Sequence, residues 1–212
     1  MWADAPPREY ELRRYLVSIL AIISLAFSAT AAAGDYQDGR AAYDVGNFEK
    51  ALAVWAPAAD SGDADSQYGM GLLYSEGIVV PMDDIQALKW FGLAADQDHG
   101  EAQYKLGVMH ANGWGVPMNE AEAMKWYTLA AENGVTAAQV SLGTMYQNGF
   151  SVEQDKIEAL KWFTVAVKLG DSDARVHQEY LAERMPAEEL AKADSEVNAW
   201  FNDHQTMLAE TR

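Results

Sequence analysis

The sequence predicts an all-α protein built from a repeated helical hairpin. The chain overlays on itself when it is shifted by 36 residues, and three of its seven tryptophans share one position of that repeat. Glycine and alanine recur at fixed positions beside them. A constant period of about 20–50 residues is the signature of a stacked-repeat architecture. The expected fold class is therefore an α-solenoid of stacked helix-turn-helix units.

Small and aromatic residues alternate in a constant order within each unit. A glycine inside a helix costs about 0.5–1 kcal/mol relative to alanine, so glycines in one register indicate that two helices approach closely. We expect the tryptophans to fill the space that the small residues leave. The recurring sets are Gln67, Gln103 and Gln139; Gly71, Gly107 and Gly143; Gly77, Gly113 and Gly149; Ala87, Ala123 and Ala159; Lys89-Trp90-Phe91, Lys125-Trp126-Tyr127 and Lys161-Trp162-Phe163; Ala94, Ala130 and Ala166.

Each unit divides into two helices. The first is expected over about 67–75 and ends at Gly77, since glycine commonly terminates a helix. The second begins at Asp83 or Asp84, which suits the N-cap, and continues to about residue 96. Its apolar stripe is Ile85, Leu88, Phe91 (or Trp90) and Ala95.

Shorter units flank the three repeats. Two helices are expected near 36–45 and 48–59, ahead of the first full unit. After Gly170, Ser172 is a candidate cap for a helix to about 184, and Pro186 begins a last helix to about 204. These final helices fit the terminal cap that such arrays require. The predicted organisation is a leader over 1–33, a repeat array over 35–171 and capping helices over 172–212.

The leader has the order of a secretory signal peptide. Arg13 and Arg14 precede an uncharged apolar stretch over 15–27, and small residues follow over 28–34. We expect cleavage after Ala31 or Ala33 and export to the periplasm or medium of a bacterium. The alternative is an uncleaved membrane anchor, because 15–33 lacks charge and approaches the ~17–25 residues that span a bilayer. No stable membrane insertion is expected unless the leader is retained.

Composition excludes several kinds of function. The formal net charge of -17 argues against a nucleic-acid partner, since phosphate backbones are bound by cationic surfaces. The chain contains no cysteine, which removes disulfides, a thiol nucleophile and thiolate metal sites. The net charge favours a basic or neutral partner.

Catalytic motifs are absent from the sequence. The four histidines form no His-Glu-x-x-His pair, and no Gly-x-Ser-x-Gly elbow or phosphate-binding glycine loop occurs. His110 falls on the core side of its helix by repeat register. The carboxylates of 60–65 are either a helix cap and turn or a calcium site, and they lack the spacing of an EF-hand loop. We therefore expect no enzymatic activity, cofactor or metal.

Three consecutive segments of one unit together resemble the Sel1-like repeat. They are Ala102-Gln103-Tyr104-x-Leu106-Gly107, Asn112-Gly113-x-Gly115-Val116 and Ala123-x-Lys125-Trp126-Tyr127. The first unit, with Gly39, Gly46-Asn47-Phe48 and Ala51, is more similar to a tetratricopeptide repeat. The resemblance implies a right-handed superhelix whose first helices line a concave face that binds proteins or peptides. His110 replaces the tyrosine of the other units, and the loops at 78–80 and 150–152 lack the second glycine.

Repeat register gives the residues expected to line that groove. Aromatic side chains are frequent anchors at protein interfaces, and amides can bind a peptide main chain. The alternative is that Tyr68 and Tyr104 pack between neighbouring units. Trp114 is separate, and either folds back onto the array or belongs to an edge contact. The predicted groove residues are Tyr36, Arg40, Tyr43, Tyr68, Leu72, Glu76, Tyr104, Val108, Asn112, Val140, Thr144, Gln147 and Asn148.

Two functions follow from this pattern. The first is an exported, non-catalytic scaffold or adaptor that binds a protein or peptide in the groove. The second is a cell-wall or polysaccharide-associated factor or enzyme accessory, in which aromatic residues stack on sugars.

Overall fold

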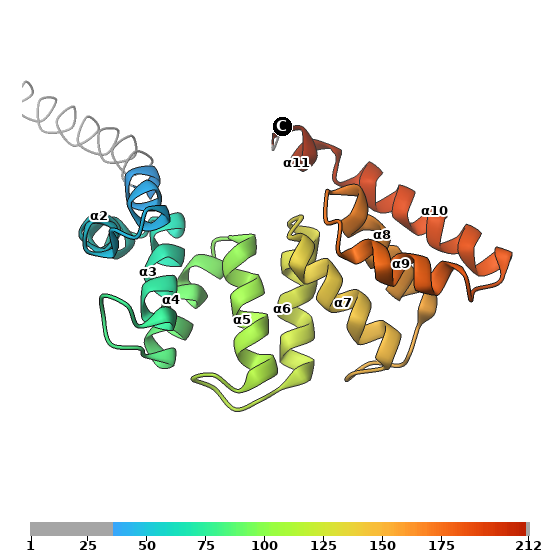
Figure 1. The fold of residues 1–212 in the computed structure, drawn as a ribbon, viewed down its shortest axis with the longest axis horizontal. Coiled ribbons are helices and arrows are strands. Elements are labelled where there is room, and N and C mark those ends of the chain that lie inside the picture. Colours follow the sequence, from blue (N-terminus) through green and yellow to red (C-terminus); the bar gives the residue numbers. More distant parts are fainter. Residues whose placement is uncertain (1–35, 211–212) are drawn as a thin grey trace, which may run out of the picture.

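The computed structural model describes residues 36–210, which form an arch of antiparallel helices (Figure 1). The predicted leader lies outside the described residues. None of the helices in the described part is long and apolar enough to span a membrane. After a helical segment at 36–44, the helices are α2 (Phe48–Asp60), α3 (Ala64–Glu76), α4 (Asp84–Ala95), α5 (Gly100–Asn112), α6 (Glu120–Glu132), α7 (Thr136–Asn148), α8 (Lys156–Lys168), α9 (Ala174–Ala182), α10 (Ala187–Asp203) and α11 (Gln205–Glu210).

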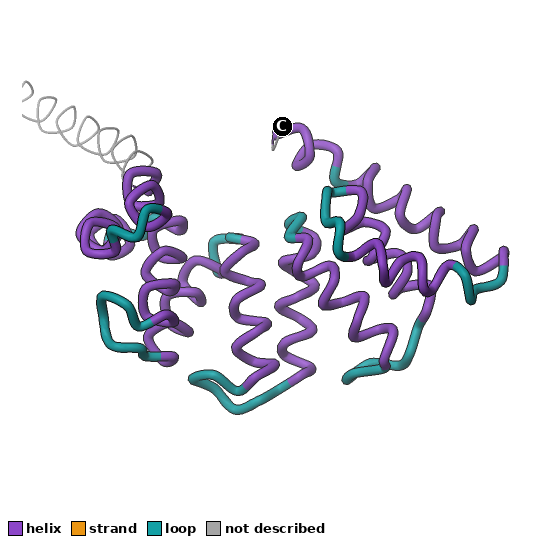
Figure 2. Tube along the Cα trace, viewed as in Figure 1, coloured by secondary structure: helices purple, strands orange, loops and turns teal. Residues whose placement is uncertain are grey.

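Consecutive helices pack side by side as hairpins. The three full units are α3–α4, α5–α6 and α7–α8, and each hairpin packs against the next. The longer loops, which join the first helix of a unit to its second, all lie along one edge of the arch (Figure 2). The predicted α-solenoid with a period of 36 residues is confirmed.

A glycine of the first helix touches an aromatic ring of the second in every unit. A Cβ added at Gly71 would lie 2.4 Å from Phe91, one at Gly107 would lie 2.5 Å from Tyr127, and one at Gly143 would lie 2.7 Å from Phe163. The prediction that the two helices approach closely at these glycines is therefore confirmed. The ring that fills the space is the residue after the tryptophan, so our assignment of this role to the tryptophans is wrong.

The tryptophans pack between units. Trp90 is half-buried against a cluster of α2 and α3 that includes Trp55 and Leu73. Trp126 packs in the same way against Phe91 and Leu106. Adjacent aromatics point in different directions around a helix, so one ring covers its own hairpin and the other covers the preceding one.

A buried glutamine joins each unit to the one before it. The Nε2 atoms of Gln67, Gln103 and Gln139 donate to the carbonyl oxygens of Ala59, Ala95 and Ala131, at 3.2, 3.4 and 3.1 Å. Each of these carbonyls also accepts from a backbone N–H of the following turn. The glutamines therefore connect a first helix to the carboxyl end of the preceding second helix.

The amide oxygen of this glutamine is satisfied in only two of the three units. Gln97 donates to Gln67 Oε1 at 2.8 Å, and Asn133 donates to Gln103 Oε1 at 2.9 Å. The corresponding residue of the last unit is Leu169, whose side chain has no hydrogen-bond donor, and Gln139 Oε1 is buried without a partner among residues 36–210. The hairpin of the last unit therefore has one side-chain hydrogen bond fewer between its first helix and the end of its second.

Helix ends follow capping chemistry and correct some predicted bounds. Asp63 accepts from Ser66 N at 2.8 Å, so α3 begins three residues before the predicted start, and the capping interpretation of this turn is correct. Asp171, rather than Ser172, accepts from the N–H groups ahead of α9. Ile85 is 66% exposed and does not belong to the apolar stripe.

The C-terminal helices close the array and reach back to the second unit. Trp200 Nε1 donates to Glu132 Oε2 at 3.1 Å, and His204 Nε2 lies 2.8 Å from the same oxygen. The Trp200 and His204 rings stack with centroids 4.1 Å apart. Helix α10 also packs along α8. Helix α10 and the turn that follows it therefore contact two different repeats.

The glycine–aromatic contact predicts opposite effects for two helical glycines. Gly107→Ala pushes a methyl group into the Tyr127 ring and is expected to lower the free energy of unfolding by about 1–3 kcal/mol. Gly92→Ala, where nothing lies within 4 Å, is expected to raise it by about 0.5–1 kcal/mol. Urea denaturation followed by circular dichroism measures both. Equal effects at the two positions would contradict the steric argument.

Because the glutamines differ in their hydrogen bonds, we expect substitutions at Gln103 and Gln139 to lower the free energy of unfolding by different amounts. Gln103→Met removes a hydrogen bond at each end of the amide and is expected to cost about 1–2 kcal/mol of unfolding free energy. Gln139→Met also removes a buried unpaired oxygen and is expected to stay within about 0.5 kcal/mol of the wild type. Chemical denaturation measures the free energy of unfolding of both variants. A larger loss for Gln139→Met than for Gln103→Met would contradict the assignment of an unpaired oxygen to Gln139.

Candidate protein-binding surface

The predicted groove residues divide into exposed and buried groups. Glu76, Asn112 and Asn148 are exposed at the ends of α3, α5 and α7. Most of the others are partly exposed: Tyr36, Arg40, Tyr43, Tyr104, Val108, Val140, Thr144 and Gln147. These residues form a discontinuous surface along the first helices.

Tyr68 and Leu72 are buried, and their assignment to an accessible groove is wrong. They are 8% and 6% exposed and belong to the cluster that joins α3, α4 and α5. The Tyr68 ring stacks on His99 of the next unit, with centroids 4.7 Å apart. This part of α3 therefore faces the start of α5. The alternative interpretation, packing between units, is therefore correct for Tyr68.

Tyr104 has an intermediate position. Its ring lies 5.8 Å from that of Tyr127 and packs against the cluster of α6 and α7, yet the residue keeps part of its surface exposed. Tyr43, in the first unit, donates from its hydroxyl to Glu76 and so joins the 36–44 helix to α3. These tyrosines contribute to packing between units and to the surface at once.

Asn112 and Asn148 each donate one hydrogen bond from the side-chain amide to the backbone of their own helix. Asn112 Nδ2 donates to Val108 O at 2.7 Å, and Asn148 Nδ2 donates to Thr144 O at 2.9 Å. A primary amide has two N–H donors and an acceptor oxygen, so each asparagine keeps groups for a partner. The bonds to the helix fix the direction of the side chain. Binding of a partner would therefore cost these two amides little side-chain entropy.

A hollow of about 230 Å³ lies at the C-terminal end of this surface. It brings the predicted residues Gln147 and Asn148 together with Gln154, Lys156, Tyr180, Leu181 and Arg184. The Arg184 guanidinium lies 4.0 Å from the centre of the Tyr180 ring and donates to the Tyr180 carbonyl at 2.8 Å. Two cations therefore face a hollow in a strongly acidic chain. The repeat pattern gave no register for α9, so sequence reasoning missed its contribution.

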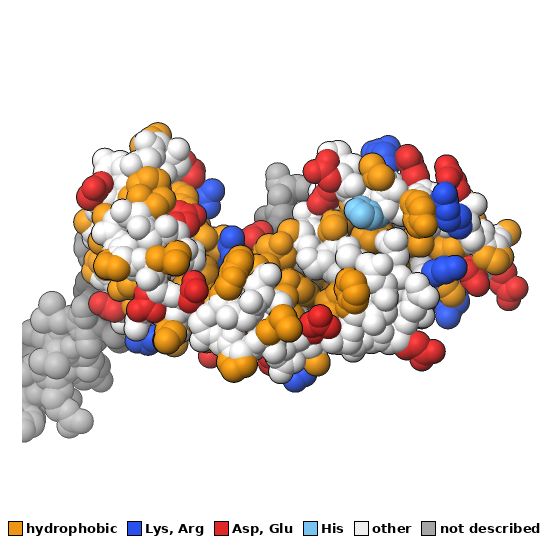
Figure 3. Space-filling model, turned by 60° about the horizontal axis from the view of Figure 1, so that its bottom comes forward, with side chains coloured by type: hydrophobic (Ala, Val, Ile, Leu, Met, Phe, Trp, Pro, Cys, Tyr) orange, Lys and Arg blue, Asp and Glu red, His pale blue; other side chains and the backbone are white. Residues whose placement is uncertain are grey.

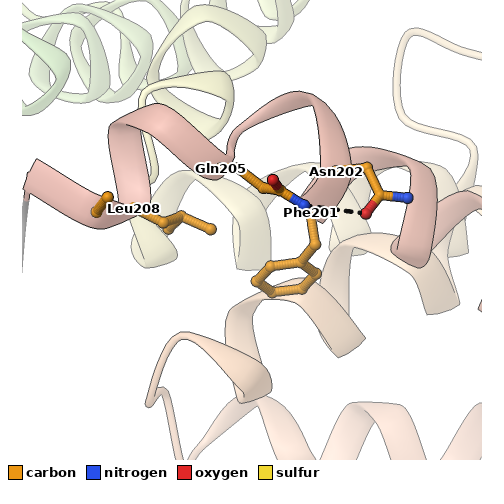
Figure 4. A pocket seen from close by; sticks show the side chains of 5 residues that line it. Phe201, Asn202, Gln205 and Leu208 are labelled. Atoms are coloured by element: carbon orange, nitrogen blue, oxygen red, sulfur yellow. Dashed lines mark hydrogen bonds between the residues drawn. The ribbon is translucent and has the colours of Figure 1, made fainter.

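A second hollow lies at the junction of α10 and α11 (Figure 4). Phe201, Asn202, Gln205, Leu208 and Ala209 line it, and Gln205 Nε2 donates to Asn202 Oδ1 at 3.4 Å. It has a volume of about 420 Å³ and contains none of the predicted groove residues. Among the described residues, no cluster of histidine and carboxylate side chains is suited to a metal.

Burial and hydrogen bonding shift the pKa of several side chains in the array. Burial raises the pKa of Tyr68 to about 12 and that of Tyr127 to about 12. Burial and the neighbouring Glu76 carboxylate raise the pKa of Tyr43. The hydrogen bond from His99, whose Nε2 lies 3.2 Å from Asp65 Oδ1, lowers the pKa of Asp65. His99 Nδ1 accepts from Ala102 N, so this ring caps α5 and contacts the preceding unit.

The array is similar to known repeat proteins. The Sel1 repeat family model matches residues 64–99, 100–135 and 136–171. The chain belongs to the Sel1 repeat family. Sel1 repeat proteins are in general scaffolds for protein–protein interaction. The observed units coincide with these three Sel1 repeats, whereas the hairpin of 36–60 and the helices after residue 171 lie beyond them.

Two solved structures resemble this Sel1 repeat chain. A protective antigen of uropathogenic Escherichia coli with an SLR fold is 29% identical, with a TM-score of 0.72, over 81% of this chain and 38% of the antigen. A Sel1 repeat protein from Oxalobacter formigenes is 32% identical, with a TM-score of 0.64, over 69% of this chain and 62% of that protein. This chain thus spans less than two thirds of either relative. A comparison with curated protein sequences finds no match.

The raised tyrosine pKa values predict a loss of stability in alkali. The folded state raises the pKa of Tyr68 and of Tyr127 to about 12 and so favours the neutral phenol. The resulting stabilisation of the folded state is complete below the unfolded pKa near 10 and disappears as pH rises toward 12. We expect the free energy of unfolding to fall between pH 9.5 and 11.5, by roughly 1–2 kcal/mol for each tyrosine.

Tyr68→Phe and Tyr127→Phe should each reduce this fall, because phenylalanine has no proton to lose. Urea denaturation at several pH values measures the effect. An unchanged slope in the double variant would contradict the assignment to these two rings.

Proposed function

We propose that this Sel1 repeat chain is an exported, non-catalytic scaffold that binds a protein or peptide along the exposed parts of its first helices. The hollow at the end of α7 is the observation that carries this proposal. It joins Gln147 and Asn148 to the side chains of a later helix, so the surface continues beyond the repeats. Export rests on the order of basic, apolar and small residues in 1–33.

The chemistry of the hollow suits the C-terminal carboxylate of a peptide or one of its acidic side chains. Lys156 and Arg184 supply positive charge, and Arg184 is already directed by the Tyr180 ring and carbonyl. Gln147, Asn148 and Gln154 supply amides that can pair with a peptide main chain. Charge-assisted hydrogen bonds to a carboxylate are roughly twice as strong as neutral ones. A bound segment would thus be oriented with its carboxylate at α9.

Loss of two exposed amides is expected to release the partner. Asn112→Ala/Asn148→Ala should reduce recovery of co-purified protein from natively expressed material about tenfold or more, with little change in folding, because both residues are exposed. Asn198→Ala, exposed on α10 away from this surface, is the matched control.

Equal recovery by wild type and double variant would remove this surface from the proposal. Saturable binding to isolated cell-wall polysaccharide, with no protein recovered, would favour the polysaccharide-associated alternative instead. Mass spectrometry of the mature protein tests export separately: a first residue at Ala32 or Gly34 supports cleavage, and a chain that begins near Met1 contradicts it.

A further inference from the structure

Exposed apolar side chains recur in the loop between the two helices of each repeat, on the loop edge of the solenoid. Ile78, Trp114 and Phe150 follow the glycines that end α3, α5 and α7, and they are 53%, 50% and 51% exposed. Met82 and Met118 lie later in the first two loops and are 69% and 68% exposed. We call these five residues the loop ridge. Large apolar side chains gathered on one surface usually mark an interaction site.

The second and third loops each contact the start of the second helix of the preceding unit. A Cβ added at Gly115 would lie 2.6 Å from the Asp84 carbonyl oxygen, which places the second loop against the start of α4. Ser151 Oγ donates to Glu120 Oε2 at 2.9 Å, which places the third loop against the start of α6. Figure 3 shows this side with apolar side chains spread among carboxylates.

The loops hold these side chains outward with fixed backbone geometry. Trp114 N donates to Met109 O, and Phe150 N donates to Met145 O, both at 3.0 Å. The far end of each loop is fixed as well, since Asn119 N donates to His110 O at 2.8 Å and Asp155 N to Tyr146 O at 3.0 Å. A partner would therefore meet preformed apolar contacts, which lowers the entropic cost of binding.

Charge around the loop ridge is negative. The segments 76–86, 112–122 and 148–158 contain three, two and three carboxylates, against Lys156 alone. Glu122 and Glu158 are paired with Lys125 and Lys161 in the following turns, at 2.7 and 2.6 Å. The others have no cation paired with them within the described residues. A second copy would bring the same negative charge to the contact and be repelled.

We propose that the loop ridge is a second protein-binding surface, adjacent to the first-helix surface but made of different residues, and that it takes an amphipathic segment with apolar and basic side chains. The apolar face of such a segment covers Trp114, Phe150 and the methionines. Its lysine or arginine side chains reach the carboxylates at the starts of α4, α6 and α8.

A defined probe tests this assignment. The probe is a dye-labelled helical peptide with leucine on one face and lysine elsewhere, compared with the same peptide carrying glutamate in place of lysine. Fluorescence anisotropy with the full purified chain should show saturable binding of the lysine peptide, weakened by salt, and no binding of the glutamate peptide. Trp114→Ser/Phe150→Ser should raise Kd at least tenfold.

The control is Leu93→Ser/Val176→Ser, which changes two exposed apolar residues outside the loop ridge and should leave Kd within twofold. Thermal denaturation checks that both variants fold. Asn112→Ala/Asn148→Ala should bind the lysine peptide like the wild type, which keeps this proposal distinct from the first-helix surface.

Four results would overturn the proposal. They are no saturable binding of the lysine peptide, equal binding of the two peptides, equal affinity of the wild type and the Trp114→Ser/Phe150→Ser variant, and binding to vesicles of zwitterionic lipid that the same variant abolishes. A concentration-dependent dimer lost in this variant would instead assign the loop ridge to a second copy.

Discussion

The close contact between a glycine and an aromatic ring inside each hairpin is the constraint on which this array depends. Without a side chain at Gly71, Gly107 or Gly143, the two helices of a unit come near enough for the ring of Phe91, Tyr127 or Phe163 to contact the glycine. That approach fixes the distance within the hairpin. It also determines which face of each second helix remains for the preceding unit, where the tryptophans pack.

Polar contacts vary from unit to unit around a constant glutamine bond. The bond to the carbonyl of the preceding unit is made in all three units, whereas the second partner, which lies in the glutamine's own unit, is Gln97, Asn133 or, in the last unit, absent from the described residues. Residue 99 is a histidine that caps α5 and stacks on Tyr68, whereas valine occupies the corresponding position 135. In a linear array each unit contacts mainly its neighbours, so such differences remain local. The same fold can thus carry different surfaces along its length.

The fold was predictable from the sequence because period, helix ends and small residues all indicate the same hairpin. The sequence did not distinguish the two adjacent aromatics of each second helix, since both occupy plausible core positions of a helical wheel. It also placed Tyr68 and Leu72 on an open face, because the part of α3 that the next unit covers is set by packing between units and not by the register of one helix. Tyr180 and Arg184 were missed because α9 follows the last repeat. Trp114 was singled out, but Ile78 and Phe150 were interpreted only as departures from the loop pattern.

The attachment of α10 to Glu132 has a mechanical consequence for the end of the array. Trp200 and His204 reach past the third unit to the second, while the same helix lies along α8. The Gln139–Ala131 bond, which joins the second unit to the third, lies between these two attachments. Separation at that junction must therefore also detach α10 from Glu132, so the third unit and the terminal helices open as one block and the last hairpin does not fray alone.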